Sequence, residues 1–121
     1  NIIAHLNEQP VKSIVEISRF LPIQFIGSNS YRILTDGPKL RRQFFDWGLF
    51  YTSPDFYQIW KRFLTVLAQR NAALKARICR NDISIWNHEF AELSELLNQK
   101  RKTYIESLIP FFNQIISVGF F

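Results

Sequence analysis

The residues of this 121-residue chain that could do chemistry are mostly cations gathered in its middle third. Residues 36–82 carry nine Lys and Arg against four Asp, whereas the rest of the chain carries six cations and six anions. A local excess of this kind is typical of a surface that meets an anionic partner. The candidate residues for binding nucleic acid or another partner are Lys39, Arg41, Arg42, Lys61, Arg62, Arg70 and Lys75.

Three of these cations lie in the stretch DGPKLRRQFFDWG, residues 36–48. Arg41 and Arg42 have two interpretations. They either contact a phosphate or a partner, or they pair within the chain, with Asp46 one turn further along the same helix.

The sequence contains no recognisable motif for nucleotide binding, metal binding or catalysis. None of the four glycines is followed by the lysine of a phosphate-binding loop. The two histidines and the single cysteine, Cys79, have no metal-binding spacing, and Cys79 is interpreted as a packing residue. The carboxylates Glu89, Glu92 and Glu95 are interpreted as a solvated helix face. The chain is therefore expected to be non-catalytic, with no cofactor and no metal of its own.

The elements that must position the cations are mainly helices. Start signals and apolar spacing predict a mainly α fold, with a long antiparallel helical hairpin, shorter helices and one short β-strand near the N-terminus. The expected elements are a short helix in 10–19, a strand at 20–26, one helical turn at 30–34, a helix from Pro38 to about Gly48, and long helices near 54–78 and 85–109. Ser53 and Pro54 are expected to form the cap and first turn of the first long helix, and Pro110 to kink or end the second.

The hairpin follows from two amphipathic patterns joined by a short connection. Its expected contacts are Trp60, Phe63 and Leu67 against Phe90, Leu93 and Leu97. Antiparallel packing would also bring the three carboxylates at 89, 92 and 95 beside the Arg70–Arg77 end of the first helix. Arg70 and Lys75 therefore either pair with Glu89 or Glu92 or face a phosphate-bearing partner.

The aromatic residues are mostly interpreted as core. Phe56, Trp60 and Phe63 lie on the apolar side of a predicted helix, which favours packing over base stacking. Phe44, Phe45 and Trp47 are too close in sequence to face one direction on a helix. At least one of these three is expected to meet another surface.

Composition limits the remaining classes of protein. No apolar run approaches the roughly 18 residues of a membrane span, which argues against a membrane protein. A single cysteine suits a reducing, cytoplasmic compartment. The chain has no methionine and ends in the apolar stretch IISVGFF, so we expect it to be cut from a longer protein.

The stretch ILTDGPKLRRQFFDWG resembles a motif of the RecF family of DNA replication and repair proteins. The matching positions are Ile33, Leu34, Gly37, Pro38, Arg41, Arg42, Phe44 and Asp46. The stretch LAQRNAALK, residues 67–75, is similar to a second recurrent RecF stretch, and Trp86 and Tyr104 fall where the family places such residues. The resemblance covers about residues 20–109. Departures from the family pattern occur at Ser28, Asn29, Asp36 and Phe45.

RecF proteins are ATPases related to SMC and Rad50 heads, with the Walker A loop before a segment like this one and the other ATPase motifs after it. The resemblance therefore implies a central helical lobe. Residues 1–35 would be a connector, with a short helix and strand, that belongs to or borders the ATPase lobe, and residues 36–121 would be helical lobe II.

For the whole protein, the resemblance implies weak DNA-dependent ATPase activity with ATP and Mg, an ATP-dependent homodimer, and binding to DNA at single-strand/double-strand junctions and gaps. It also implies cooperation with RecO and RecR in loading RecA, in recombination and the SOS response. The alternative is a stand-alone basic helical module whose cations serve a protein partner. A full-length gene with a Walker A lysine upstream would exclude that alternative.

Overall fold

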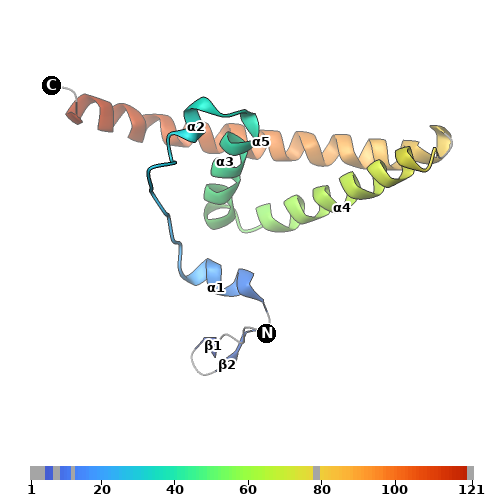
Figure 1. Cartoon of the computed structure of the whole chain (residues 1–121), viewed down its shortest axis with the longest axis horizontal. Helices are drawn as coiled ribbons and strands as arrows, with labels where there is room; N and C mark the ends of the chain where they lie inside the picture. The colour runs from blue at the N-terminus through green and yellow to red at the C-terminus, as the bar shows by residue number, and fades with distance from the viewer. Residues whose placement is uncertain (1–4, 7–8, 12, 78–79, 120–121) are drawn as a thin grey trace. The chain divides into compact units, whose positions relative to one another are not determined.

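The computed structural model describes residues 5–6, 9–11, 13–77 and 80–119, and within them the chain is mainly helical, as the sequence predicts (Figure 1). The chain divides into two compact units, Asn1–Arg41 and Arg42–Phe121. The elements in chain order are β1 (His5–Leu6), β2 (Gln9–Pro10), α1 (Ile14–Phe20), α2 (Arg32–Thr35), α3 (Pro38–Thr52), α4 (Phe56–Lys75) and α5 (Arg80–Gly119).

The first unit holds the small strands and the two short helices. β1 and β2 pair antiparallel, with His5 opposite Pro10. α1 confirms the predicted short helix, although it starts later, at the cap residue Ser13, whose Oγ accepts a hydrogen bond from the backbone N–H of Val15 at 3.2 Å. α2 confirms the predicted helical turn.

The predicted strand at 20–26 is wrong. Phe20 belongs to α1, and residues 21–27 form neither helix nor strand. A strand is stable only beside another strand, and Pro22 removes one of the backbone donors that such pairing would need. The strand content lies instead in β1 and β2, nearer the N-terminus.

α3 begins at Pro38 as predicted, but it does not end near Gly48. It continues to Thr52, where the N–H of Ser53 bonds to the carbonyl of Leu49 at 2.9 Å. Gly48 is buried inside the helix and faces the ring of Tyr104 from α5. A glycine weakens a helix by only about 1 kcal/mol relative to alanine, so close packing at this position overrides its tendency to end one.

α4 and α5 form the predicted antiparallel hairpin (Figure 1). Three cross-links show the direction: Asp55 bonds to Lys100, Arg62 to Glu89, and Arg70 to Asn87. Partner numbers on α5 fall along the chain as those on α4 rise, which only antiparallel helices allow.

The ends of both long helices differ from the prediction. The cap of α4 is Asp55, not Ser53, which instead donates from Oγ to the Asp55 carboxylate at 2.8 Å. α4 ends at Lys75, and Ile78 and Cys79 lie outside the described residues. α5 starts five residues earlier than predicted and continues through Pro110 to Gly119, so the proline does not end it.

The core of the second unit is built from the three helices α3, α4 and α5. Leu49, Phe56 and Leu97 are its buried centre, one from each helix. The side chains packed around this centre are Phe50, Ile59, Trp60, Phe63 and Tyr104. Of the predicted hairpin contacts, Phe63 and Phe90 stack at 5.4 Å and Leu97 is buried, whereas Leu67 and Leu93 are only half-buried.

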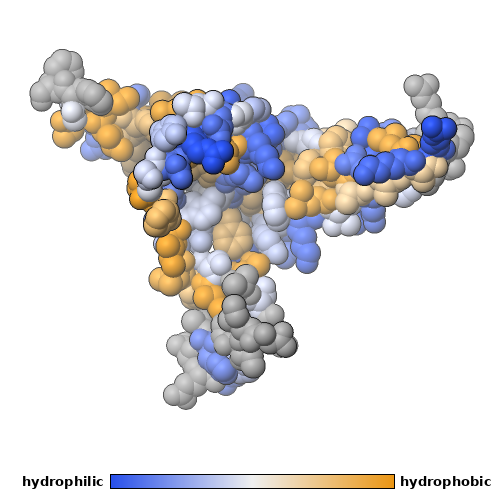
Figure 2. All heavy atoms as spheres, in the orientation of Figure 1, coloured by the Kyte–Doolittle hydropathy of each residue, from blue (hydrophilic) through white to orange (hydrophobic). Residues whose placement is uncertain are grey.

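The last turns of α5 carry apolar side chains on their surface (Figure 2). Phe111, Phe112, Ile115, Ile116 and Val118 are all more than half exposed. None of the helices described is long and apolar enough to cross a membrane.

Candidate nucleic-acid interface

The cations at the start of α3 do not share one environment. Lys39 and Arg42 are exposed. Arg41 is also exposed, but its Nη1 donates hydrogen bonds to the carbonyl oxygens of Asp36 at 2.8 Å and Ile33 at 3.4 Å. These carbonyls lie at the end of α2, where no helical N–H is available to them, so Arg41 helps to close that helix.

Two of the α4 cations face α5. Arg62 donates from Nε to Glu89 Oε1 at 2.5 Å, and this hydrogen bond raises the pKa of Arg62 above its ordinary value. Arg70 donates from Nε to Asn87 Oδ1 at 2.7 Å, and its guanidinium carbon lies 5.4 Å from the centre of the Phe90 ring. Both arginines therefore hold the hairpin together.

The other two α4 cations, Lys61 and Lys75, point to solvent. Both are exposed, and no ion pair of either is found among the described residues. They are nearly four turns apart, so they lie close to one face of the helix at a separation of about 21 Å. The structure thus divides the seven predicted residues, with Lys39, Arg42, Lys61 and Lys75 as exposed cations and Arg41, Arg62 and Arg70 as cations with partners in the chain.

The prediction that Glu89, Glu92 and Glu95 lie beside the Arg70–Arg77 end of α4 is wrong. Glu89 pairs with Arg62, which is about two helical turns before the expected Arg70–Arg77 end. Glu92 lies 3.3 Å from His88, and Glu95 accepts a hydrogen bond from Gln99 on its own helix. The cause is the position of the connection, since α4 ends at Lys75 and α5 starts at Arg80, both earlier than predicted, so each α5 residue faces an earlier residue of α4.

Asp46 does not pair with Arg41 or Arg42, as one interpretation of the sequence held. It accepts two hydrogen bonds from Arg101 of α5, from Nε at 2.7 Å and from Nη2 at 2.8 Å. Both side chains are largely buried, with 16% of Asp46 and 17% of Arg101 exposed. Sequence reasoning missed Arg101 because the two residues are 55 positions apart and nothing local marks them as partners.

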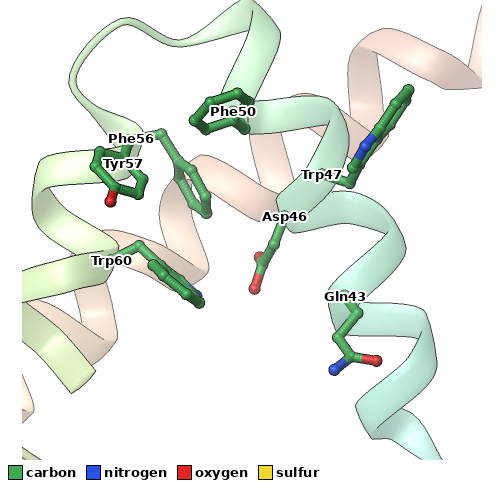
Figure 3. Close-up of a pocket in the computed structure, with 7 residues that line it drawn as sticks. All are labelled: Gln43, Asp46, Trp47, Phe50, Phe56, Tyr57 and Trp60. Carbon is green, nitrogen blue, oxygen red and sulfur yellow. The ribbon is translucent and has the colours of Figure 1, made fainter. Parts of the chain in front are cut away.

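A hollow of about 300 Å³ lies between α3 and α4 (Figure 3). Its lining is mostly aromatic and consists of Gln43, Asp46, Trp47, Phe50, Phe56, Tyr57 and Trp60. Trp47 is 37% exposed and Phe44 is 36% exposed, so the aromatic residues of early α3 do remain partly on the surface. Phe56 and Trp60 belong to the core and also form one wall of the hollow.

Curated relatives of this chain share one name, "DNA replication and repair protein RecF". The protein of Psychromonas ingrahamii is 40% identical over 112 residues, which cover 93% of this chain and 31% of the relative. Those of Vibrio parahaemolyticus and a Marinomonas species are 42% and 37% identical, over 83% and 91% of the chain. The chain belongs to the RecF family. No family model and no solved structure matches it.

The chain spans about a third of the length of the RecF proteins it matches. The match with the Psychromonas RecF takes in 112 of the 121 residues and therefore includes residues of both compact units. The family assignment thus applies to the short N-terminal elements as well as to the three-helix unit.

Proposed function

We propose that this chain is a non-catalytic, DNA-binding helical lobe of a RecF-type recombination mediator. The single observation that carries the proposal is 37–42% identity, over most of the chain, to proteins named for DNA replication and repair. The exposed cations agree with it, since they lie on a chain with a net charge of +5.

Within this lobe, Lys61 and Lys75 are the phosphate contacts of α4. Their heads are exposed, whereas Arg62 and Arg70 are engaged with Glu89 and Asn87. A separation of about 21 Å corresponds to about six base pairs along the axis of a duplex, at 3.4 Å each. One DNA segment can therefore meet both lysines.

The remaining parts of the proposal concern the longer protein. It binds ATP and Mg through motifs outside this chain, dimerises with ATP bound, and hydrolyses ATP weakly when DNA is present. It recognises single-strand/double-strand junctions and acts with RecO and RecR to load RecA in the cytoplasm. The chain itself offers no glycine–lysine loop for the phosphates of ATP, so a titration with ATP and Mg should show no binding and no turnover.

A salt series on duplex DNA tests the DNA-binding role. Each phosphate contact contributes roughly −0.9 to the slope of log K against log salt. The double variant Lys61→Ala/Lys75→Ala should therefore flatten the slope by up to about 1.8 and leave thermal unfolding unchanged.

The matched control is Arg62→Ala/Arg70→Ala, which removes the same charge from the same helix. Because these two arginines bond to α5, their loss should lower thermal stability and change the slope less. Equal slopes for the lysine variant and the unsubstituted chain would remove α4 from the DNA interface and favour the alternative, a basic module for a protein partner such as RecR.

A further inference from the structure

We propose that the hollow between α3 and α4 takes one unstacked base of single-stranded DNA, with Lys61 at its rim contacting the adjoining phosphate. The inference rests on the proposed DNA-binding function and adds to it a second kind of contact. The exposed lysines contact only the backbone, whereas the hollow would contact a base.

The shape and lining of the hollow suit a flat ring. Tyr57 and Trp60 form one wall and are stacked, with ring centres 6.3 Å apart and planes at 26°. Phe50 meets Tyr57 edge-on at 5.7 Å, and Trp47 stands on the α3 side (Figure 3). A volume of about 300 Å³ is at the lower end of small-ligand pockets, so it fits one ring system and not a helix or strand of a partner.

The polar groups of the hollow suit a nucleotide as well. Gln43 is exposed at the edge, and its amide offers both a donor and an acceptor, as the edge of a base requires. Asp46 would repel a phosphate if it were free, but both of its carboxylate oxygens are bonded to Arg101. The lining therefore presents no unbalanced negative charge to a nucleic acid.

Lys61 supplies the positive charge. It follows Tyr57 by four residues in α4, which places the two side chains as neighbours on the helix surface. It is exposed and carries no ion pair among the described residues. A strand of DNA offers a flat ring for the hollow and a phosphate for this lysine at a fixed, short separation in every nucleotide. Stacking of this kind tolerates every base because each has a π-face.

The test compares an oligothymidylate of about 12 nucleotides with an abasic strand of the same length. Tryptophan fluorescence of the unsubstituted chain should be quenched by the oligothymidylate and not by the abasic strand. Trp47→Ala and Tyr57→Ala should each weaken binding to the oligothymidylate by about tenfold, because a base–aromatic contact is lost. Binding to the abasic strand and to duplex DNA should be unchanged.

Two controls accompany these variants. Tyr31→Ala removes an exposed aromatic ring outside the hollow and should leave oligothymidylate affinity unchanged. Trp47→Phe keeps a ring and should retain most of the affinity, which separates stacking from a general loss of fold.

The outcomes separate this inference from the proposed function. Absence of duplex binding by the unsubstituted chain would contradict the proposed function itself. In the other case, the unsubstituted chain binds duplex DNA, but Trp47→Ala binds the oligothymidylate as tightly as the unsubstituted chain does. That result would contradict only the base-binding hollow. A hollow that serves an apolar side chain of a protein partner would give that second result.

Discussion

The two ends of the α4–α5 hairpin are made of the same two helices but differ in what covers them. At one end, the junction, α3 packs on both helices and the core of Leu49, Phe56 and Leu97 forms. Towards the other end, the tip, no third helix is found within the described part of Arg42–Phe121. There the two helices bury Val66, Ala73 and Ile83, and they are also joined by the stacked rings of Phe63 and Phe90 and by the bonds of Arg62 and Arg70.

The ion pairs show what the third helix changes. Asp46–Arg101 at the junction has two short hydrogen bonds and side chains that are 16% and 17% exposed. Arg62–Glu89 nearer the tip has one bond and side chains that are 54% and 31% exposed. Water screens the second pair and competes for it, so it contributes less to stability. A carboxylate–arginine pair therefore stabilises the junction more than the tip, and the stability of the tip depends more on apolar contacts.

The largest effect is expected from Leu97→Ala at the junction. Leu97 is 1% exposed, and its loss would leave a cavity between three helices. The free energy of unfolding should fall by about 2–5 kcal/mol, as for other large-to-small core changes. Leu96→Ala is the matched control one residue away, since Leu96 is 39% exposed, and it should cost far less. Chemical denaturation measures both, and equal losses would show that the junction is not the core.

Gly48→Ala tests the close approach of α3 to α5. A Cβ on Gly48 would overlap the hydroxyl of Tyr104 and lie 2.5 Å from Cζ of its ring, so the ring must move. We expect a cost of about 1–3 kcal/mol from overpacking, partly offset by the better helix propensity of alanine. Gly119→Ala is the control, because nothing lies within 4 Å of the added carbon there. Combining Tyr104→Ala with Gly48→Ala should remove the overlap, so the double variant should lose less stability than the sum of the two single losses. Additive losses would argue against the overlap.

Asp46→Asn and Glu89→Gln compare the two ion pairs directly. Asp46→Asn leaves the largely buried guanidinium of Arg101 without a charged partner, and we expect a loss of about 1–2 kcal/mol. Glu89→Gln acts on an exposed pair and should cost less than about 0.5 kcal/mol. Thermal unfolding at low and high salt checks both, since only the exposed pair should depend on salt. Equal costs for the two variants would mean that α3 does not shield the junction.

The hairpin was predictable from sequence because it rests on a periodic pattern. Apolar residues that recur every three or four positions define the facing sides of α4 and α5, whatever the exact ends of the helices. Gly48 was predicted to end a helix, and Pro110 to kink or end one, because each disfavours a helix locally. Both lie inside helices in the structure, since packing or continued backbone bonding outweighs a local preference.

The candidate site was less predictable. Composition identified the cations as a group, but which of the α4 cations are paired depends on the register of α5 against α4, and Arg41 bonds to backbone carbonyl oxygens that no charge pattern marks. The strand at 20–26 failed for a related reason, since a strand depends on a partner that its own sequence does not specify. The hollow was missed because its aromatic residues come from two helices whose contact no local pattern encodes.

The smallest effect is expected where the junction meets solvent, at Asp55. Its carboxylate accepts hydrogen bonds from Lys100 at 2.8 Å and from Ser53 at 2.8 Å, and these hold its pKa below the ordinary value of 3.8. Because the folded pKa is lowered, the contribution of Asp55 to stability is present above pH 3.8 and is lost as the pH falls through the folded value.

Asp55 is 61% exposed, so the change in the free energy of unfolding should be too small to detect, whereas an NMR titration of the carboxyl carbon should resolve the pKa shift. Lys100→Gln should move the titration midpoint back towards 3.8, and Ser53→Ala should move it less, since the bond to Lys100 is the larger cause. A midpoint at 3.8 in the unsubstituted chain would show that Lys100 does not hold Asp55, and that the polar edge of the junction is as open to water as the tip.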